Sequence, residues 1–263
     1  MAKAIEQIER DIAALSEAVK AIATEVASVY TSYLIALGQA VRTQLILATY
    51  QICTQGYPKQ FLSLSVSQRQ QLQQAISKLG KNAAEQLINQ LKFQAQSAQE
   101  VGGEPDNSEL LFAQLSNPIE LVQWQQNLEQ AIAHSLKTLS LETNLLLQQA
   151  GILAQKLPPP LLEAATAAPD AADLAAGVPN LMNLLIETEN PTDSEETSMT
   201  QLIAIQLRLS EIEFTDVNVR AARNQIRQLE NRVNLLKREY QKKQQERTIA
   251  EAEAAWRSSW FEE

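Results

Sequence analysis

The chain has 263 residues, of which 45% are hydrophobic and only 5% aromatic, and its formal net charge is −9. This acidity disfavours nonspecific binding of the whole molecule to nucleic acid or to an anionic membrane. Cys53 is the only cysteine and His134 the only histidine, which excludes an intramolecular disulfide and leaves too few ligands for a structural zinc site.

No motif of an active site occurs in the sequence. The glycine-rich patterns that cradle phosphate groups are absent. Ser135 follows His134 directly, but adjacent residues of a helix do not face each other, so they do not form a base and a nucleophile. We therefore expect no catalytic residue, no metal, no cofactor and no small-molecule substrate. An enzyme with a carboxylate site inside a helical bundle would show no such motif, and it ranks behind the two non-enzymatic functions given at the end of this section.

The spacing of apolar residues predicts a first helix with a coiled-coil seam. From Ile5 to Tyr33, apolar residues recur at alternating steps of three and four, which is the heptad pattern. Beyond Tyr33 a step of four replaces a step of three, which indicates a local unwinding of the supercoil. Gly56 and Pro58 are typical of a helix end, so we expect this helix to stop near Gln55.

Two further helices are predicted in residues 1–157. Ser67 with Gln70 has the spacing of a capping box at the start of the second. The third has a cap and a proline at residues 116–118, with an earlier possible start at Ser108, and three prolines stop it after Leu157. Because the loop between the first two helices is short, we expect them to pack antiparallel as a hairpin, and residues 1–157 to form a coiled-coil-like bundle of three long helices.

The most apolar stretch, Val29 to Cys53, is long enough to span a bilayer. It contains Arg42 and three glutamines, which are costly in lipid, so the stretch predicts a water-soluble helix with a wide buried face. Charged residues interrupt the first 28 positions, and no signal-peptide core is present there. We expect a soluble, cytoplasmic protein.

Residues 158–198 differ in composition from the rest of the chain. They hold six of the nine prolines and eight acidic residues, with no Lys or Arg. Such a segment buries too little apolar area to offset the entropy of ordering, which predicts a linker. Apolar residues after Pro179 predict one short helix near 180–187, either a cap over the bundle or a partner-binding motif.

Residues 199–263 are predicted to form a long basic helix. Heptad-like spacing runs from Ile205 to Tyr240, and the seam positions then become charged at Lys243 and Arg247. We expect the seam contact to fade after Tyr240.

Between Arg220 and Arg247, nine basic residues stand against three acidic ones, a local charge of +6. The candidate partner-binding residues that fall near one face of this helix are Arg220, Arg223, Arg227, Arg238 and Lys242. The first interpretation of the pattern is a solvated helix, or one that faces the chain's own acidic linker. The other readings are an acidic protein partner and, against the overall acidity, lipid or nucleic acid.

Three large aromatic residues crowd the last eight positions: Trp256, Trp260 and Phe261. Such a cluster either anchors the terminus on its own core or docks into another protein.

These patterns together predict an all-α protein, an elongated bundle of long helices with coiled-coil seams plus a separate long C-terminal helix. The expected function is a non-enzymatic scaffold or adaptor that contacts a protein partner or another copy of itself through coiled-coil and helix-in-groove contacts. The alternative is a peripheral membrane or nucleic-acid-associated protein that uses the basic helix at residues 220–247.

Overall fold

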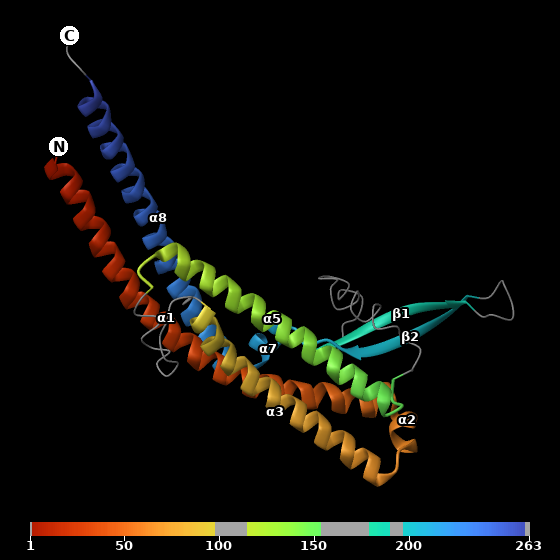
Figure 1. Ribbon diagram of the computed structural model, residues 1–263. Coiled ribbons are helices and arrows are strands. Elements are labelled where there is room, and N and C mark those ends of the chain that lie inside the picture. The colour runs from red at the N-terminus through yellow and green to blue at the C-terminus, as the bar shows by residue number, and fades with distance from the viewer. Residues whose placement is uncertain (1, 98–114, 154–178, 190–196, 261–263) are drawn as a thin grey trace. The chain divides into compact units, whose positions relative to one another are not determined.

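The computed structural model describes residues 2–97, 115–153, 179–189 and 197–260, and most of its regular structure is helical (Figure 1). The long helices are α1 (Ala2–Gln51), α3 (Val66–Ser97), α5 (Pro118–Gln149) and α8 (Val217–Ser259). The short elements are the π-helix η1 (Ile52–Gly56), α2 (Pro58–Ser63), α7 (Leu209–Thr215) and the strands β1 (Leu181–Glu189) and β2 (Thr197–Ile205). The predicted all-α fold with a long C-terminal helix is confirmed.

Side-chain caps explain where two of the long helices begin. At α5, Asn117 Oδ1 accepts a hydrogen bond from the Ile119 N–H at 3.0 Å, as the sequence predicts. At α3, the capping box is formed by Ser65 and Gln68, whose side chains each accept from the other's backbone N–H. The predicted box at Ser67 is wrong by two residues, because both serines have a glutamine three positions on.

Helix α5 ends earlier than the expected stop at Leu157. Gly151 adopts a left-handed φ of 76°, and the Ile152 N–H donates to the Leu147 carbonyl at 2.9 Å. That bond and the left-handed glycine are the Schellman arrangement, which satisfies carbonyls at a helix C-terminus. Glycine tolerates this φ because it lacks a Cβ.

The short helix predicted near residues 180–187 is wrong, since these residues lie in strand β1. β1 pairs antiparallel with β2, so that Leu181 stands opposite Ile205 and Glu189 opposite Thr197. A short apolar run is compatible with either a strand or a helix, and the partner strand that decides between them lies elsewhere in the sequence. β2 also takes the first residues of the predicted C-terminal helix, which begins at Val217 instead.

The chain forms two compact units built from separated stretches. Unit 1 contains residues 1–33, 89–130 and 221–263, and unit 2 contains residues 34–88 and 131–220. The predicted division into a bundle at 1–157, a linker at 158–198 and a helix at 199–263 stays a prediction. Of the linker, residues 158–178 and 190–196 lie outside the described residues, as does the alternative helix start at Ser108.

In unit 1, α1 and α8 run antiparallel, because α1 residues 33, 25 and 11 contact α8 residues 223, 232 and 243 in that order (Figure 1). The seam is fully buried where α5 adds a third helix. There the core consists of Val19, Ile22 and Val26 from α1, Leu121, Trp124 and Leu128 from α5, and Ile226, Leu229 and Val233 from α8. Farther toward the end of α8, Leu236 and Tyr240 are only half-buried, because α5 does not reach this part of the contact between α1 and α8.

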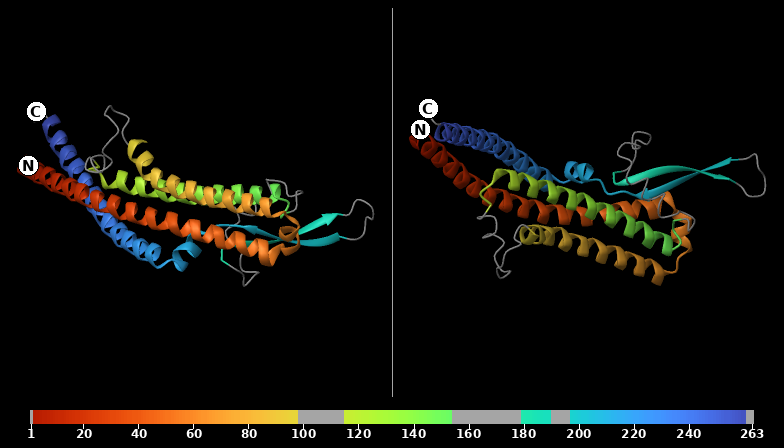
Figure 2. Two further views of the ribbon diagram at one scale, coloured as in Figure 1. Left: turned by 90° about the horizontal axis from the view of Figure 1, so that it is seen from below. Right: turned by 45° about the horizontal axis from the view of Figure 1, so that its top comes forward.

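Unit 2 packs the second part of α1 against α3, α5 and the base of the hairpin. A Cβ placed on Gly38 would stand 3.0 Å from the Ala84 Cβ, so glycine permits α1 and α3 to approach closely. Met182, Leu202 and Ala204 are buried at the hairpin base, while the outer part of the hairpin projects away from the helices of this unit (Figure 2). Among the helices that the structure describes, none combines the length and apolar character that a membrane crossing requires.

Candidate interaction site on helix α8

The end of α8 exposes the aromatic pair that the sequence singles out. The Trp256 and Trp260 residues are 67% and 66% exposed, and their ring centroids lie 5.8 Å apart at an interplanar angle of 38°. A spacing of four residues places them on the same helix face. Phe261, the third predicted member, lies outside the described residues. Two large apolar rings in water on one face are typical of a contact surface.

The five candidate basic residues of α8 separate into two environments. Arg227, Arg238 and Lys242 are exposed in unit 1, and Arg220 is exposed in unit 2. Arg223 is only 8% exposed and binds residues of its own unit. The exposed cations of unit 1 can therefore meet a partner, whereas Arg223 holds α8 in place.

Arg223 is paired with Glu129 of α5. Its Nη1 donates to Glu129 Oε1 at 2.6 Å and its Nη2 to Glu129 Oε2 at 3.0 Å, a two-pronged pairing that suits the planar guanidinium. Nη2 also donates to the Tyr33 hydroxyl at 2.6 Å, and the guanidinium lies 4.5 Å from the Tyr33 ring centroid. A buried charge requires such partners, so α1, α5 and α8 are joined at one point.

Tyr30 completes this anchor and has a shifted pKa. Its hydroxyl donates to Glu129 Oε1 at 2.9 Å, and its ring meets Trp124 edge to face at 5.5 Å. Burial, and then the negative charge of Glu129, raise the pKa of Tyr30 far above its usual value. On the same helix as Arg223, desolvation raises the pKa of the half-buried Glu230, while Arg223 acts in the opposite direction.

Ion pairs continue between α1 and α8 beyond the anchor. Arg232 contacts Glu25 at 2.8 Å, and Lys243 contacts both Asp11 and Glu246 at 3.0 Å. Hydrogen bonding to Lys243 lowers the pKa of Asp11, and Glu246 followed by Asp11 raises the pKa of Lys243. An ion pair between the two helices therefore lies beyond Tyr240, while the apolar seam positions Leu236 and Tyr240 are only half-buried. The charged seam position finds an acid on α1.

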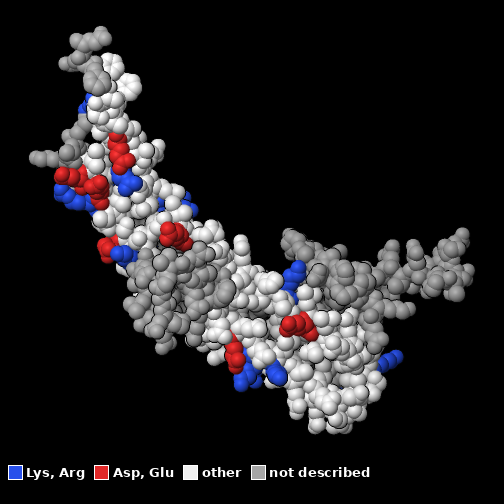
Figure 3. All heavy atoms as spheres, viewed as in Figure 1, with Lys and Arg blue, Asp and Glu red and all other residues white. Residues whose placement is uncertain are grey.

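The exposed face of this region carries both signs of charge. Acidic and basic side chains lie close together over α1 and α8, with no continuous basic surface on the face drawn in Figure 3. The +6 of the basic segment is thus partly offset by α1 acids such as Asp11 and Glu25. A phosphate backbone or an anionic bilayer is poorly matched to such a mixture.

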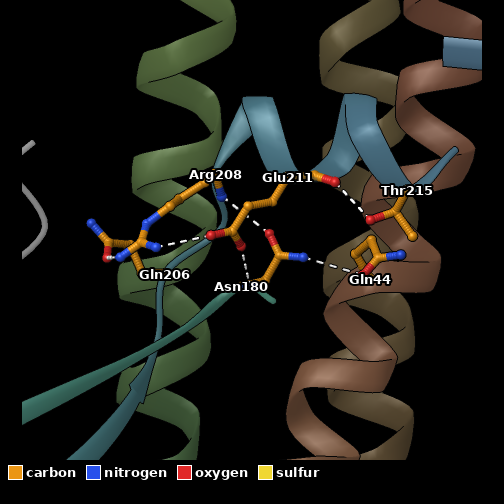
Figure 4. Close-up of polar contacts among 6 residues, drawn as sticks. All are labelled: Gln44, Asn180, Gln206, Arg208, Glu211 and Thr215. Atoms are coloured by element: carbon orange, nitrogen blue, oxygen red, sulfur yellow. Dashed lines mark hydrogen bonds and ion pairs between the residues drawn. The ribbon is translucent and has the colours of Figure 1, made fainter. Parts of the chain in front are cut away.

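Unit 2 contains a second polar cluster, centred on Asn180 at the start of the hairpin (Figure 4). Asn180 has a left-handed φ of 63°, its Nδ2 donates to Gln44 at 3.1 Å, and its Oδ1 accepts from the Arg208 N–H at 3.1 Å. The backbone N–H of Asn180 donates to Glu211, which also pairs with the Arg208 guanidinium at 2.8 Å. The two strand ends are thereby tied to α1 and α7.

Side chains of α5, and of Tyr57 between η1 and α2, also bind the outer edge of β2 at its base. Asn144 of α5 donates to the Ile205 carbonyl and accepts from the Ile205 N–H, both at 2.9 Å, as a neighbouring strand would. The Tyr57 hydroxyl accepts from the Ile203 N–H, and Ser140 accepts from the Leu207 N–H, again at 2.9 Å.

Sequence reasoning missed the residues of both clusters. Glu129, Asn144 and Asn180 belong to no motif, and their partners lie far away in the chain. One signal was available, because Asn144 interrupts the apolar run of α5 at a core position, and a buried amide needs hydrogen-bond partners.

Groups suited to covalent or metal chemistry do not gather in the described part of the chain. Within it, no three His, Cys, Asp or Glu side chains lie close enough to hold a metal ion. Cys53 is buried, and burial raises the pKa of its thiol to about 11, which keeps it protonated near neutral pH.

Comparisons with protein-family models, with curated proteins and with solved structures found no match for the chain.

Proposed function

We propose that the protein is a cytoplasmic scaffold or adaptor that binds a protein partner through the end of α8. The observation that carries the proposal is the exposed Trp256 and Trp260 pair. The coiled-coil contact between α1 and α8 holds the helix that carries this pair. The end of α8 inserts into a groove on the partner.

The energetics of the pair favour an interaction outside the chain. Burying a large apolar side chain contributes roughly 1.5–3 kcal/mol of binding free energy. Two adjacent rings can therefore form the central contact of a small interface. The rings sit far along α8 from the Arg223 anchor, and the ion pairs with Glu25 and Asp11 support the helix between them. A helix held along its length loses little freedom when its end is bound.

The exposed cations of unit 1 favour an acidic protein surface as the partner. Arg227, Arg238 and Lys242 stand exposed on the same helix as the rings. Charges around an apolar contact chiefly accelerate the encounter of complementary partners and exclude others. The mixed signs along α1 and α8 disfavour the alternative of membrane or nucleic-acid binding.

The test is the double substitution Trp256→Ala with Trp260→Ala. We expect crosslinking and mass spectrometry to show that proteins captured by the wild-type chain are lost with this variant, because the apolar contact is removed. The matched control is Ile249→Ala, which removes another exposed apolar side chain of α8, 52% exposed, and should keep the captured set.

Thermal unfolding separates binding from stability in this experiment. Since both rings are exposed, the double variant should melt as the wild type does. A lowered melting temperature with an unchanged captured set would mean that the aromatic residues anchor the chain internally, and the adaptor proposal would fail. Salt-dependent binding of the wild type to anionic vesicles, lost in the same variant, would favour the membrane alternative instead.

A further inference from the structure

The hydrogen bonds at the base of the hairpin show which of its residues direct their backbone groups outward. The Gln206 N–H donates to the Asn180 carbonyl at 3.0 Å, so residues 180 and 206 form a hydrogen-bonded pair. In an antiparallel ladder such pairs alternate with non-hydrogen-bonded ones. With Leu181 opposite Ile205, the odd-numbered residues of both strands therefore point their N–H and C=O groups away from the hairpin.

The contacts at the base of the hairpin confirm independently that the odd-numbered residues point outward. Ile203 and Ile205 are odd-numbered, and their N–H groups donate to Tyr57 and Asn144 outside the hairpin. The side chains of Tyr57 and Asn144 thus take the place of a neighbouring strand along the base of β2. Within the described residues the sheet has two strands only, so no third strand pairs with β1. Its outward positions are residues 181, 183, 185, 187 and 189.

An unpaired edge of this length is a template for another strand. A two-stranded hairpin is marginally stable alone, whereas three or more strands with an apolar face are stable. The outer part of this hairpin projects beyond the helices of unit 2 (Figure 2), and its sequence is apolar at three consecutive positions, Leu184 to Ile186. A further strand along this edge would widen the hairpin to a sheet of the size that is stable.

We propose that β1 pairs antiparallel with β1 of a second copy of the chain, so that two hairpins form one four-stranded sheet. The register that centres on Leu185 brings all five outward positions of each copy into hydrogen-bonded pairs. Such a contact is symmetric about a two-fold axis and closes at a dimer. The inference does not depend on the proposed role of the aromatic pair on α8.

Charge explains why a second copy fits in this orientation. In the register centred on Leu185, Glu187 stands opposite Asn183 of the second copy and Glu189 opposite Leu181. A parallel arrangement would align each glutamate with itself, and like charges directly opposite are destabilising. The antiparallel self-pairing therefore places no carboxylate opposite another.

The test compares two proline substitutions at one level of the hairpin. Leu185 and Gln201 are register partners, and both are outward positions, on β1 and β2. Proline removes an outward N–H in either case and leaves the β1–β2 ladder bonds in place. Light scattering and sedimentation should show that the wild type is a dimer and that Leu185→Pro is a monomer. The two controls should remain dimers: Gln201→Pro changes the other strand, and Leu185→Val keeps the N–H of residue 185.

Amide hydrogen exchange gives a second readout that does not depend on a variant. The N–H groups of Leu185 and Glu187 should become protected as the protein concentration rises, because they enter the ladder between copies. Far-ultraviolet circular dichroism of both proline variants checks that the helices are retained.

Several outcomes would overturn the proposal. A wild-type chain that stays monomeric at every concentration excludes self-pairing. A dimer that is lost only in Gln201→Pro would mean that the copies pair through β2 and not through β1. A dimer that survives Leu185→Pro and is lost in the Trp256→Ala, Trp260→Ala variant belongs to the α8 site. Protection of the β1 amides that requires another protein would identify a different occupant.

Discussion

Units 1 and 2 both place polar groups inside an apolar core, but they do so with different chemistry. Unit 1 joins α5 to α8 by a charged pair, Arg223 with Glu129, across 94 residues of chain. Unit 2 joins α5 to β2 by a neutral amide, Asn144, across 61 residues. Each contact links elements that the sequence places far apart.

The two chemistries respond differently to substitution. A buried ion pair loses hydration energy on both sides, so removing one partner leaves an uncompensated charge, whereas replacing both by apolar side chains can be neutral. Asn144 satisfies the backbone of Ile205, and no substitution can remove that backbone. The amide contact is therefore difficult to replace, and the charged contact is replaceable only as a pair.

The largest effect is expected for Arg223→Ala. The free energy of unfolding should fall by about 3 kcal/mol, near the lower end for buried ion pairs, because the Glu129 side chain keeps 29% of its surface exposed. Denaturant titration measures the loss. The double variant Arg223→Met with Glu129→Leu should recover most of it, and a double variant as unstable as the single would show that the pair itself stabilises the unit.

A smaller loss is expected for Asn144→Ala in unit 2. The Ile205 N–H and carbonyl would lose their partner while buried. A water molecule can replace part of the removed amide, so each group should cost about 1 kcal/mol, the lower end for unsatisfied buried groups, and the total loss should be about 2 kcal/mol. Hydrogen exchange at Ile205 should accelerate together with the loss of stability. Asn183→Ala, at an exposed asparagine of β1, should change neither quantity. Unchanged exchange at Ile205 in Asn144→Ala would contradict the edge contact.

The smallest effect concerns alkaline pH and compares Tyr30 with Tyr57. Burial raises the pKa of both phenols, and Glu129 adds to the shift of Tyr30, whereas the hydrogen bond from Ile203 opposes the shift of Tyr57. A raised folded pKa means that stability is complete below about pH 10, where the unfolded phenol titrates, and declines above it.

Replacing each tyrosine by phenylalanine isolates its share of this decline. Above about pH 10, Tyr30→Phe should flatten the loss of stability more than Tyr57→Phe does. A stronger flattening in Tyr57→Phe than in Tyr30→Phe would contradict the larger pKa shift of Tyr30.

The helices could be predicted from sequence because their signals are local. The period of apolar residues from Ile5 to Tyr33, and the cap at Asn117, lie within a few residues of the structure that they determine. The hairpin could not, since β1 is defined by its pairing with β2, and its apolar run alone is ambiguous. Likewise, the basic pattern of α8 gave no reason to separate Arg223 from its exposed neighbours, because Glu129 belongs to another helix.

The antiparallel contact of α1 with α8 has a consequence for how the chain folds. Glu25 and Arg232 are 207 residues apart, so the loop between them must close before their contact stabilises anything. Contacts of such separation slow folding, and during synthesis α1 emerges long before α8. Until then the apolar seam of α1, with Val19, Ile22 and Val26, is open to other nascent chains. Unit 1 should therefore be the later of the two to mature, and the one that benefits from a chaperone.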